Sequence, residues 1–412
     1  MEYLKLKEKL EKYNQQQLLK FYEELSEKQQ QELLNQINNI DLEQVEELFS
    51  LTKKQPEKSI EDKIEPIKYI DRLKLSTEET EEYTKIGENI LEAGKFAFVT
   101  LAGGQGTRLG HTGPKGTYKI GISPDKSLFE ILCENLKRAR NKYKVNIPWY
   151  IMTSRENNDD TIEFFKENNY FGYSKNYVKF FKQNELPMLD MDGKIILESK
   201  AKVREAADGH GGVFNAMHTN DIIQDMEKRN IKWCFIGGVD NVLLKMVDPC
   251  FIGLAESQKV KVASKSIVKA SPDEKVGVFC KRNSRPSVIE YTEITDAMAR
   301  TTDANGELLY GESHILCNLF SLEALKQIAT EKLPYHVAFK KSSYIDGFGK
   351  IINPILPNAY KFEAFIFDAF SKFDDMLIYR SIRDEEFAPI KNKVGIDSVI
   401  TARKLYKEYW NL

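Results

Sequence analysis

The stretch "FAFVTLAGGQGTRLG", residues 96–110, joins an apolar run to a turn that holds four glycines and one arginine. The aromatic and β-branched residues at its start are typical of a buried strand. The glycines would let backbone N–H groups approach a bound anion or base closely. We therefore expect a core strand followed by a ligand-binding loop.

The glycine spacing excludes two familiar nucleotide-binding patterns. A P-loop requires GxxxxGK[ST], and no Lys-Ser or Lys-Thr follows the glycines here. The dinucleotide fingerprint is GxGxxG, whereas Gly104, Gly106 and Gly110 are spaced GxGxxxG, which argues against a nicotinamide-dependent dehydrogenase. Arg108 in the loop and Lys115 in "GPKG" supply two cations instead. On the loop alone, a tight turn with a surface arginine remains the alternative.

Downstream of residue 96, short apolar runs alternate with helix-like segments as far as about residue 244. This alternation predicts βαβ units and a parallel, doubly wound sheet, in which ligands bind beyond the carboxyl ends of the strands. The runs "KVKVASKSIVKA" (259–270), "VGVFC" (276–280) and "VIEYTEI" (288–294) are expected to add antiparallel strands that wall a substrate pocket. The fold class is therefore α/β with a mixed central sheet.

The regions on either side of this sheet have a different pattern. Residues before 88 are expected to be helical throughout, with a capping box at Ser26–Gln29, a helix start at Asp41 and a charged connector at 52–66. The chain should close with a helix at 398–410. The predicted division is a helical N-terminal region at 1–88, a catalytic domain at 89–345 and a small C-terminal domain at 346–412.

Composition narrows the choice of partners. The 412 residues include 60 basic and 62 acidic ones, with a formal net charge of −2, so we expect neither nucleic acid nor a membrane surface as a partner. The five cysteines are scattered and show no zinc-binding spacing, which is typical of reduced thiols. We see no signal peptide or spanning segment, and predict a cytoplasmic protein that acts on a small molecule.

A second loop, "GGVDN" at 237–241, also follows an apolar run. A carboxylate such as Asp240 at the carboxyl end of a strand could supply an oxygen ligand to a nucleotide-bound Mg²⁺ (or Mn²⁺). An aspartate that caps the loop is the simpler alternative. Lys391, in "FAPIKN", could add a further cation, although a lone lysine is more often a surface residue.

A third glycine turn, "DGHGG" at 208–212, precedes a predicted helix. A lone histidine such as His210, or His314 in "ESHILCNLF", is more often structural than catalytic. We find no nucleophile–base–orienter triad. Phosphoryl or nucleotidyl transfer to a phosphate oxygen needs none, because that nucleophile is already ionised.

At this point the residues resemble a known family. The stretch "LAGGQGTRLG…GPKG" is similar to the signature of the UDP-sugar pyrophosphorylases, the UTP:sugar-1-phosphate uridylyltransferases, and within them most similar to the UDP-N-acetylglucosamine branch. Further support runs along nearly the whole chain, in consistent order: "FYEELSEKQQQELLNQI", "FFKQNELPMLDMDGKIILESKAKV", "DGHGG", "VDNVL", "DPCFIG", "VGVFC", "VIEYTEI", "FIFDAF" and "RDEEFAPIKN".

The resemblance implies a Rossmann-like nucleotidyltransferase fold, with UTP and a sugar-1-phosphate as substrates and a UDP-sugar and pyrophosphate as products. It implies that Arg108, Lys115 and Lys391 act on the phosphates and that Asp240 binds the metal. The nucleotide-binding positions that it implies are Gly103, Gly104, Gln183, Gly209 and His210. The sugar-binding positions that it implies are Gly277, Glu290, His314, Phe365 and Phe367.

Two departures from the N-acetylglucosamine branch concern the sugar. The branch has "GNGG" where this chain has "GHGG", and an asparagine in "GNIANHF" where this chain has His314. N-acetylglucosamine-1-phosphate is the expected sugar substrate, with glucose-1-phosphate or a broad sugar range as the alternative. A non-enzymatic nucleotide-sugar sensor is the other class of function, but it would be expected to lack Arg108, Lys115 or Asp240. The oligomeric state is not predicted.

Overall fold

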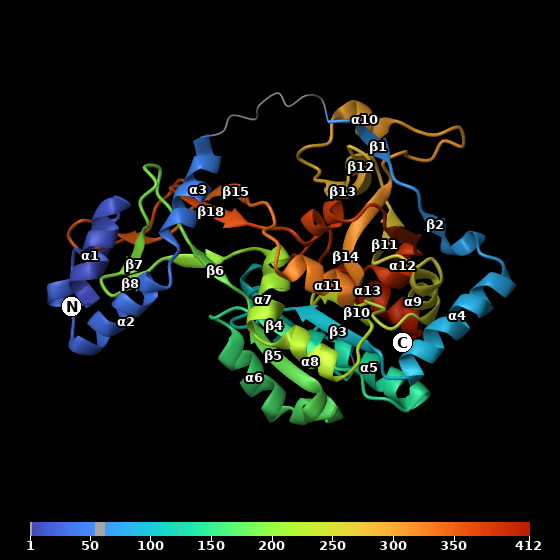
Figure 1. Cartoon of the computed structure of the whole chain (residues 1–412). Helices are drawn as coiled ribbons and strands as arrows, with labels where there is room; N and C mark the ends of the chain where they lie inside the picture. The colour runs from blue at the N-terminus through green and yellow to red at the C-terminus, as the bar shows by residue number, and fades with distance from the viewer. Residues whose placement is uncertain (1, 54–61, 123) are drawn as a thin grey trace. The chain divides into compact units, whose positions relative to one another are not determined.

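The computed structural model describes residues 2–53, 62–122 and 124–412 (Figure 1). The central part of the predicted connector, residues 54–61, lies outside the described residues. The chain forms two compact units, each built from several stretches of sequence. Unit 1 comprises residues 1–61, 184–212 and 333–365, and unit 2 comprises residues 62–183, 213–332 and 366–412.

In its described residues, unit 1 combines helices with four short antiparallel strand pairs. Its helices are α1 (Glu2–Lys12), α2 (Glu27–Asn38) and α3 (Leu42–Lys53). Its strands are β6 (Glu185–Pro187), β7 (Leu197–Ser199), β8 (Lys202–Val203), β9 (Glu205–Ala207), β15 (His336–Lys340), β16 (Tyr344–Ile345), β17 (Ile351–Ile352) and β18 (Ala359–Glu363). The pairs are β6–β9, β7–β8, β15–β18 and β16–β17, and apolar side chains of the helices and strands share one core.

Both helix starts predicted in this region are confirmed. The Ser26 hydroxyl accepts a hydrogen bond from the Gln29 N–H, and the Gln29 side chain accepts one from the Ser26 N–H, which is a complete capping box. The carboxylate of Asp41 accepts hydrogen bonds from the N–H groups of Glu43 and Gln44, each at 3.1 Å. Each cap satisfies backbone donors that have no partner within their own helix.

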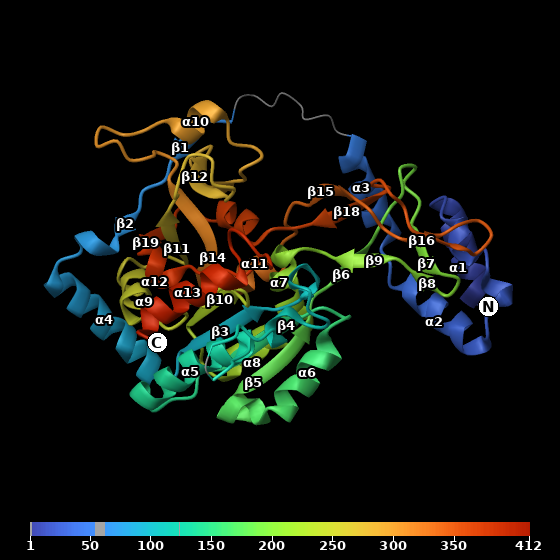
Figure 2. The same cartoon turned by 180° about the vertical axis from the view of Figure 1, so that it is seen from behind.

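Unit 2 is organised around a mixed sheet of 11 strands within the described residues, seen from two sides in Figures 1 and 2. The main path follows β2 (Ile70–Asp71), β19 (Leu377–Arg380), β11 (Val262–Val268), β14 (Glu312–Ser321), β10 (Trp233–Gly238), β3 (Phe96–Leu101), β4 (Trp149–Thr153) and β5 (Val178–Lys182). Strands β10, β3, β4 and β5 run parallel, whereas β14 runs antiparallel to both of its neighbours. The predicted α/β fold with a mixed central sheet is confirmed.

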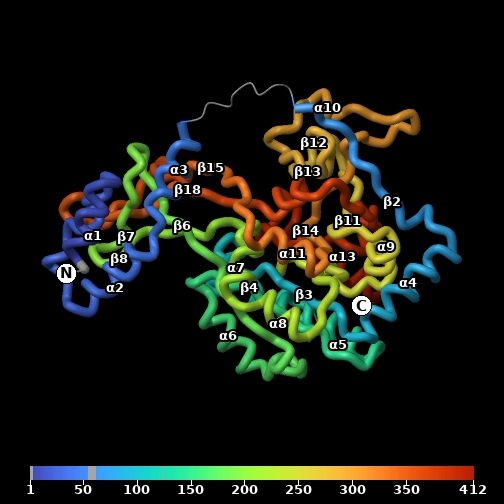
Figure 3. The backbone as a smooth tube through the Cα atoms, viewed as in Figure 1, coloured from blue at the N-terminus to red at the C-terminus, as the bar shows by residue number. Residues whose placement is uncertain are grey.

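The remaining elements extend or cover this sheet. The further strands are β1 (Ile64–Pro66), β12 (Val278–Arg282) and β13 (Arg285–Ile289), with β1 and β13 both antiparallel to β12. The helices are α4 (Thr77–Glu92), α5 (Leu128–Tyr143), α6 (Asn158–Glu167), α7 (Val213–Thr219), α8 (Ile222–Lys228), α9 (Pro249–Ser257), α10 (Asp296–Arg300), α11 (Leu322–Ala329), α12 (Arg383–Glu386) and α13 (Val399–Trp410). Helix α13 confirms the predicted closing helix, and the backbone trace in Figure 3 follows the whole path.

The prediction that residues 1–88 are helical throughout is wrong at β1 and β2. Each strand has only two or three residues, and its partner (β12 or β19) lies more than 200 residues away along the chain. A local hydrophobic pattern cannot reveal such a pairing. The compact units also end at other places than the predicted domain limits, since β1 and β2 join unit 2 and the β15–β18 pair spans residue 345.

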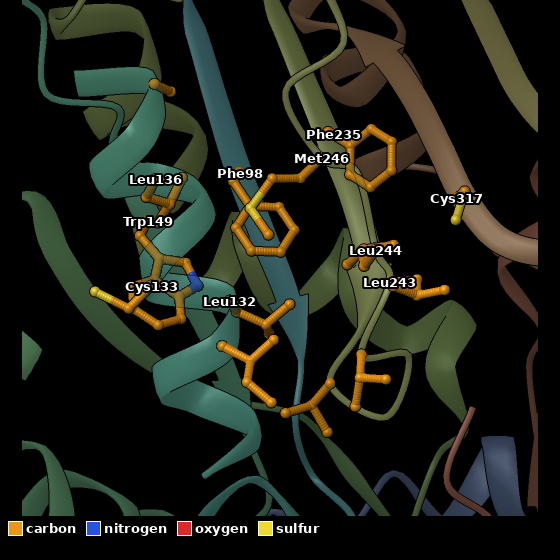
Figure 4. Close-up of a cluster of buried hydrophobic side chains, with 14 of the residues drawn as sticks. Phe98, Leu132, Cys133, Leu136, Trp149, Phe235, Leu243, Leu244, Met246 and Cys317 are labelled. Atoms are coloured by element: carbon orange, nitrogen blue, oxygen red, sulfur yellow. The ribbon is translucent and has the colours of Figure 1, made fainter. Parts of the chain in front are cut away.

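The middle of the sheet of unit 2 is held by large side chains on its central strands. All six residues of β3 are buried, and the Phe98 ring lies 6.1 Å from that of Phe235 and 6.4 Å from that of Trp149. Figure 4 shows Phe98 in this cluster, with side chains of α5 on one side of it and Phe235 on the other. In the described residues, no helix is both long and apolar enough to cross a membrane.

The strand register determines where the loops emerge. Leu101, near the end of β3, pairs with Gly238 at the end of β10 and with Met152 of β4. Because these strands are parallel, the segments that follow them leave the sheet at the same edge. This edge brings together the glycine-rich loop after β3 and the "GGVDN" loop after β10.

Candidate functional site

The glycine-rich loop after β3 folds back on itself through backbone hydrogen bonds. The Gly106 N–H donates to the Gly113 carbonyl at 3.0 Å, and the Lys115 N–H donates to the Gly104 carbonyl at 3.0 Å. These bonds bring residues 113–115 back beside Gly104 and Gly106, near the start of the loop. The loop therefore closes on itself, and Lys115 lies beside Gly104 although the two are 11 residues apart along the chain.

A buried asparagine holds this loop against the neighbouring strand. Asn157, in the turn after β4, is fully buried, and its Nδ2 donates to the carbonyls of Ala102 at 3.0 Å and Gly104 at 3.3 Å. Its Oδ1 accepts from the Ser154 N–H at 2.8 Å. Sequence reasoning missed this residue, and its only signal is an asparagine in the loop after the second parallel strand.

The structure brings Gly103 and Gln183 together. Gln183 follows β5, and its backbone N–H donates to Thr153 at 2.8 Å. Its side chain lies so close to Gly103 that a Cβ atom there would be 2.3 Å from the Gln183 Oε1. Gly104, in contrast, faces open space. The pair offers a backbone surface beside an amide that can both donate and accept hydrogen bonds.

Lys115 and Asp240 form the ion pair at the centre of the site. The Lys115 Nζ lies 3.0 Å from the Asp240 Oδ2, and both side chains are largely buried, with 13% and 27% of their surface exposed. Burial by itself would raise the pKa of Asp240, but the charges of Lys115 and Lys391 outweigh it and lower that pKa below its ordinary value. The carboxylate is therefore ionised at neutral pH.

Asn241 joins the loop of Asp240 to the segment of Lys391. Its Nδ2 donates to the Glu386 carbonyl at 2.6 Å, and its Oδ1 accepts from the Ala388 N–H at 2.9 Å. The Ile390 N–H donates to the Asp240 carbonyl at 2.9 Å. Asn241 is buried, and the sequence analysis gave it no role of its own.

The two other predicted phosphate-binding cations are more exposed. The Lys391 ammonium pairs with Asp397 at 3.2 Å and keeps 43% of its side-chain surface exposed. Arg108 is exposed and forms no ion pair within the described residues. Both side chains can therefore turn toward an incoming anion without breaking a buried contact.

The site contains one candidate metal ligand. The part of the chain that the structure describes has no group of three or more histidine, cysteine, aspartate or glutamate side chains arranged to hold a metal ion. Mg²⁺ in nucleotide sites takes one or two carboxylates and fills its other positions with phosphates and water. Asp240 alone therefore fits a metal that arrives with a nucleotide, and does not fit an all-protein metal site.

Four of the predicted sugar-binding residues lie together in unit 2. The His314 ring is surrounded by those of Phe279, Phe367 and Phe370, with centroids 5.3, 5.6 and 5.9 Å away, and we call these four side chains the aromatic cluster. The His314 N–H donates to the Gly277 carbonyl at 2.9 Å.

Glu290 approaches the same place, because a Cβ atom at Gly277 would be 3.1 Å from its Oε1. Phe279 and Phe370 were not predicted. Their signal was two more phenylalanines, in "VGVFC" and "FIFDAF". The structure thus joins Gly277, Glu290, His314 and Phe367 in one part of unit 2.

The remaining predicted residues lie in unit 1. The Phe365 ring is stacked on that of His336, with centroids 4.5 Å apart, and lies 5.3 Å from that of His210. Gly209 has a positive φ of +87°, and a Cβ there would be 2.3 Å from the Ala364 carbonyl oxygen. Only glycine suits that backbone and that contact. His336 was missed, since a single histidine in a short strand carries no pattern.

Comparisons with known proteins place the chain in a family. The sequence profile of the family described as UTP–glucose-1-phosphate uridylyltransferase matches residues 42–408. The human UDP-N-acetylhexosamine pyrophosphorylase-like protein 1 is 38% identical over 321 residues, which are 75% of this chain and 63% of the human protein. The match thus spans less than two thirds of that relative's length.

Two further proteins extend the likeness. The UDP-N-acetylglucosamine pyrophosphorylase of Saccharomyces cerevisiae is 36% identical over 373 residues, which cover 87% of this chain and 78% of the yeast protein. A solved structure of the UDP-N-acetylglucosamine pyrophosphorylase from Trypanosoma brucei superposes with a TM-score of 0.82 at 30% identity, covering 98% of this chain and 84% of the other.

Proposed function

Because this chain belongs to the UTP–glucose-1-phosphate uridylyltransferase family, we propose that it makes a UDP-sugar and pyrophosphate from UTP and a sugar-1-phosphate. The observation that carries the proposal is the Lys115–Asp240 pair at the carboxyl edge of the parallel strands, with Lys391 acting on the same carboxylate. Two cations and one ionised carboxylate at this edge suit a nucleotide triphosphate and its metal.

In the proposed reaction, a phosphate oxygen of the sugar-1-phosphate attacks the α-phosphorus of UTP. A new P–O bond forms, the bond between the α-phosphorus and the bridging oxygen breaks, and pyrophosphate leaves with that oxygen. The nucleophile is already an anion, so no general base is needed. Arg108, Lys115 and Lys391 lower the barrier by offsetting negative charge on the α-phosphate and on the leaving group.

Asp240 is the residue that would hold Mg²⁺ or Mn²⁺. Bound there with a nucleotide, the metal would neutralise phosphate charge and fix the phosphates in place. The carboxylate is suited to this because Lys115 keeps it ionised. The low pKa of Asp240 also means that the site does not lose its ligand to protonation at neutral pH.

Gly103, Gly104 and Gln183 are proposed to contact the uracil. The amide of Gln183 can satisfy both a donor and an acceptor on the base edge, and the adjacent glycines leave room for the ring. Gly209 and His210 keep the nucleotide-binding role that the resemblance implies, and Phe365 keeps its role toward the sugar. Gly277, Glu290, His314 and Phe367 are proposed to contact the sugar of the sugar-1-phosphate.

N-acetylglucosamine-1-phosphate is the proposed sugar substrate, supported by the names of the yeast and trypanosomal relatives. Glucose-1-phosphate is the second candidate, and a specific observation favours it. His314 occupies the centre of the aromatic cluster at the position where the N-acetylglucosamine branch has a smaller asparagine. An imidazole is larger than an asparagine side chain and would leave less room beside a sugar bound there.

The test is pyrophosphate release by the purified protein with UTP, Mg²⁺ and a panel of sugar-1-phosphates. We expect turnover with N-acetylglucosamine-1-phosphate, and loss of turnover when the metal is chelated. Turnover of glucose-1-phosphate alone would refute the proposed sugar and leave the enzyme class intact. Binding of a UDP-sugar without any pyrophosphate exchange would refute the proposed uridylyltransferase activity. The cytoplasmic location remains a prediction.

A further inference from the structure

A lysine is completely buried in the sheet behind the phosphate-binding loops. Lys265 is the central residue of β11, and none of its side-chain surface is exposed. Its Nζ lies 2.8 Å from the Asp248 Oδ2, 2.9 Å from the Glu386 Oε1 and 3.3 Å from the Lys245 carbonyl oxygen. One ammonium thus joins β11 to residues 245–248 and to Glu386, which is 121 positions further along the chain.

The buried charges around Lys265 are not explained by a contribution to folding stability alone. Burial would lower the pKa of Lys265, but Asp248 and Glu386 outweigh it and raise that pKa, so the lysine stays charged. Burial raises the pKa of Glu386, and its Oε2 accepts no hydrogen bond within the described residues. Replacing such a buried ionic group with apolar side chains is often neutral or stabilising, so the group calls for another explanation.

The sheet is irregular beside Lys265. On β14, which pairs with β11, the register shifts between the partners of Ser264 and Ser266, the two neighbours of Lys265. Leu316 within that shift has a positive φ of +56°, which is unusual for a leucine. Irregularities of this kind aim a side chain in a new direction and are common next to active sites.

The segments that Lys265 joins are those that carry the proposed catalytic groups. Glu386 ends α12, its carboxylate contacts the Lys265 ammonium, and its carbonyl accepts the hydrogen bond from Asn241. Five residues later comes Lys391. On the other side, Lys245 and Asp248 follow Asp240 in the chain. The ammonium therefore holds the segments that lead to both Asp240 and Lys391.

We propose that Lys265, with Glu386 and Asp248, is a positioning residue that sets the placement of Lys391 relative to Asp240. The inference rests on the proposed function, since it concerns the same reaction. Lys265 is buried and acts without touching the substrate. It acts by keeping the backbone of 386–391 bonded to the loop of 240–245, so that Lys391 faces the metal-binding carboxylate.

A double-mutant cycle tests this role. We expect Lys265→Met to lower kcat about tenfold and Lys391→Ala to lower it by about 10², the scale of one charge-stabilising group. If Lys265 acts through Lys391, the double variant should be no more than about twofold worse than Lys391→Ala alone. If the loss of kcat in the double variant instead equals the product of the two single losses, the proposal is overturned. Lys261→Met, an exposed ion-pair lysine beside the same strand, is the matched control and should leave kcat unchanged.

Amide hydrogen exchange provides a second test that needs no activity. In Lys265→Met, the N–H groups of Ala388 and Ile390 should exchange faster, because their acceptors on Asn241 and Asp240 are no longer held. The N–H groups of β11 should stay protected. Unchanged protection at residues 388 and 390 would overturn the proposal, even if the wild-type protein proved to have no uridylyltransferase activity.

A conservative variant guards against simple misfolding. Glu386→Gln keeps the shape of the side chain and its hydrogen-bonding Oε1 but removes the charge. It should shift kcat and the exchange of residues 388 and 390 in the same direction as Lys265→Met, by a smaller factor. If Lys265→Met does not fold, Glu386→Gln replaces it in the double-mutant cycle with Lys391→Ala. If the fold-losses in kcat of these two variants multiply in the double variant, the proposal is again overturned.

Discussion

Asp240 and Asp208 are both aspartates at the end of a strand, next to glycines, and their environments are opposite. Asp240 has the Lys115 ammonium at 3.0 Å and a lowered pKa. Asp208 is 4% exposed, its Oδ1 accepts no hydrogen bond within the described residues, and burial raises its pKa from 3.8 to about 7. A nearby cation, and not the strand end or the glycines, keeps a buried aspartate ionised.

The two residues also act on stability in opposite pH ranges. The lowered pKa of Asp240 adds stability above its ordinary pKa, and this contribution is lost as the pH falls through the folded-state value. The raised pKa of Asp208 favours the protonated folded state, so its contribution is lost as the pH rises from 3.8 toward about 7.

The largest expected effect comes from removing the cation that distinguishes the two sites. Lys115→Ala should lower turnover at saturating UTP by about 10² or more, because it removes a charge that stabilises the transition state and leaves Asp240 without its partner. Steady-state pyrophosphate release measures this. Lys119→Ala, an exposed lysine four residues on, is the control and should be active. Full turnover in Lys115→Ala would contradict the role.

The second test removes the charge from the other aspartate. In Asp208→Asn the side chain stays neutral at every pH, so the wild type should lose stability relative to the variant by up to about 1.4 kcal/mol per pH unit between about pH 4 and pH 7. Above that range the difference should be constant. Thermal unfolding of both proteins across the pH range measures this difference. If the stability of the wild type and of the variant changes with pH in the same way, the Asp208 pKa is not raised.

The third test concerns the loop that presents Lys115. Gly103→Ala would push the Gln183 side chain away, since a Cβ would lie 2.3 Å from its Oε1. We expect the KM for UTP to rise about tenfold with little change in melting temperature, because the displaced group is the end of a flexible side chain. Gln183→Ala should raise it similarly. If the double variant is worse than either single variant, the two residues do not act together.

The smallest expected effect lies away from both aspartates, in the aromatic cluster. His314→Asn should raise the kcat/KM ratio of N-acetylglucosamine-1-phosphate over glucose-1-phosphate by about fivefold, because it makes room beside the sugar without altering the charged groups. Parallel assays with the two sugars measure the ratio. An equal loss for both sugars would show that His314 supports the cluster without selecting the sugar.

Much of the site could be predicted because its residues lie at strand ends with clear local patterns. Loop 102–118 and Asp240 follow apolar runs that β3 and β10 confirm. Asn157, Asn241 and Lys265 were missed, because a buried polar residue looks like a surface residue until its hydrogen-bond partners are known. Strands β1 and β2 were missed for the same reason, since each depends on a distant partner.

The amino-acid sequence by itself determined the α/β class, the alternation of strands and helices after residue 96, and the family, because these follow from local periodicity and from motifs spread along the chain. Only the tertiary structure decided that Lys115 and Lys391 act on one carboxylate, that His314 sits among three phenylalanine rings, and that Lys265 joins three segments. These relations depend on long-range strand register and on burial. Lys115 and Asp240, like Lys265 and Glu386, are more than 100 positions apart along the chain and lie within hydrogen-bonding distance.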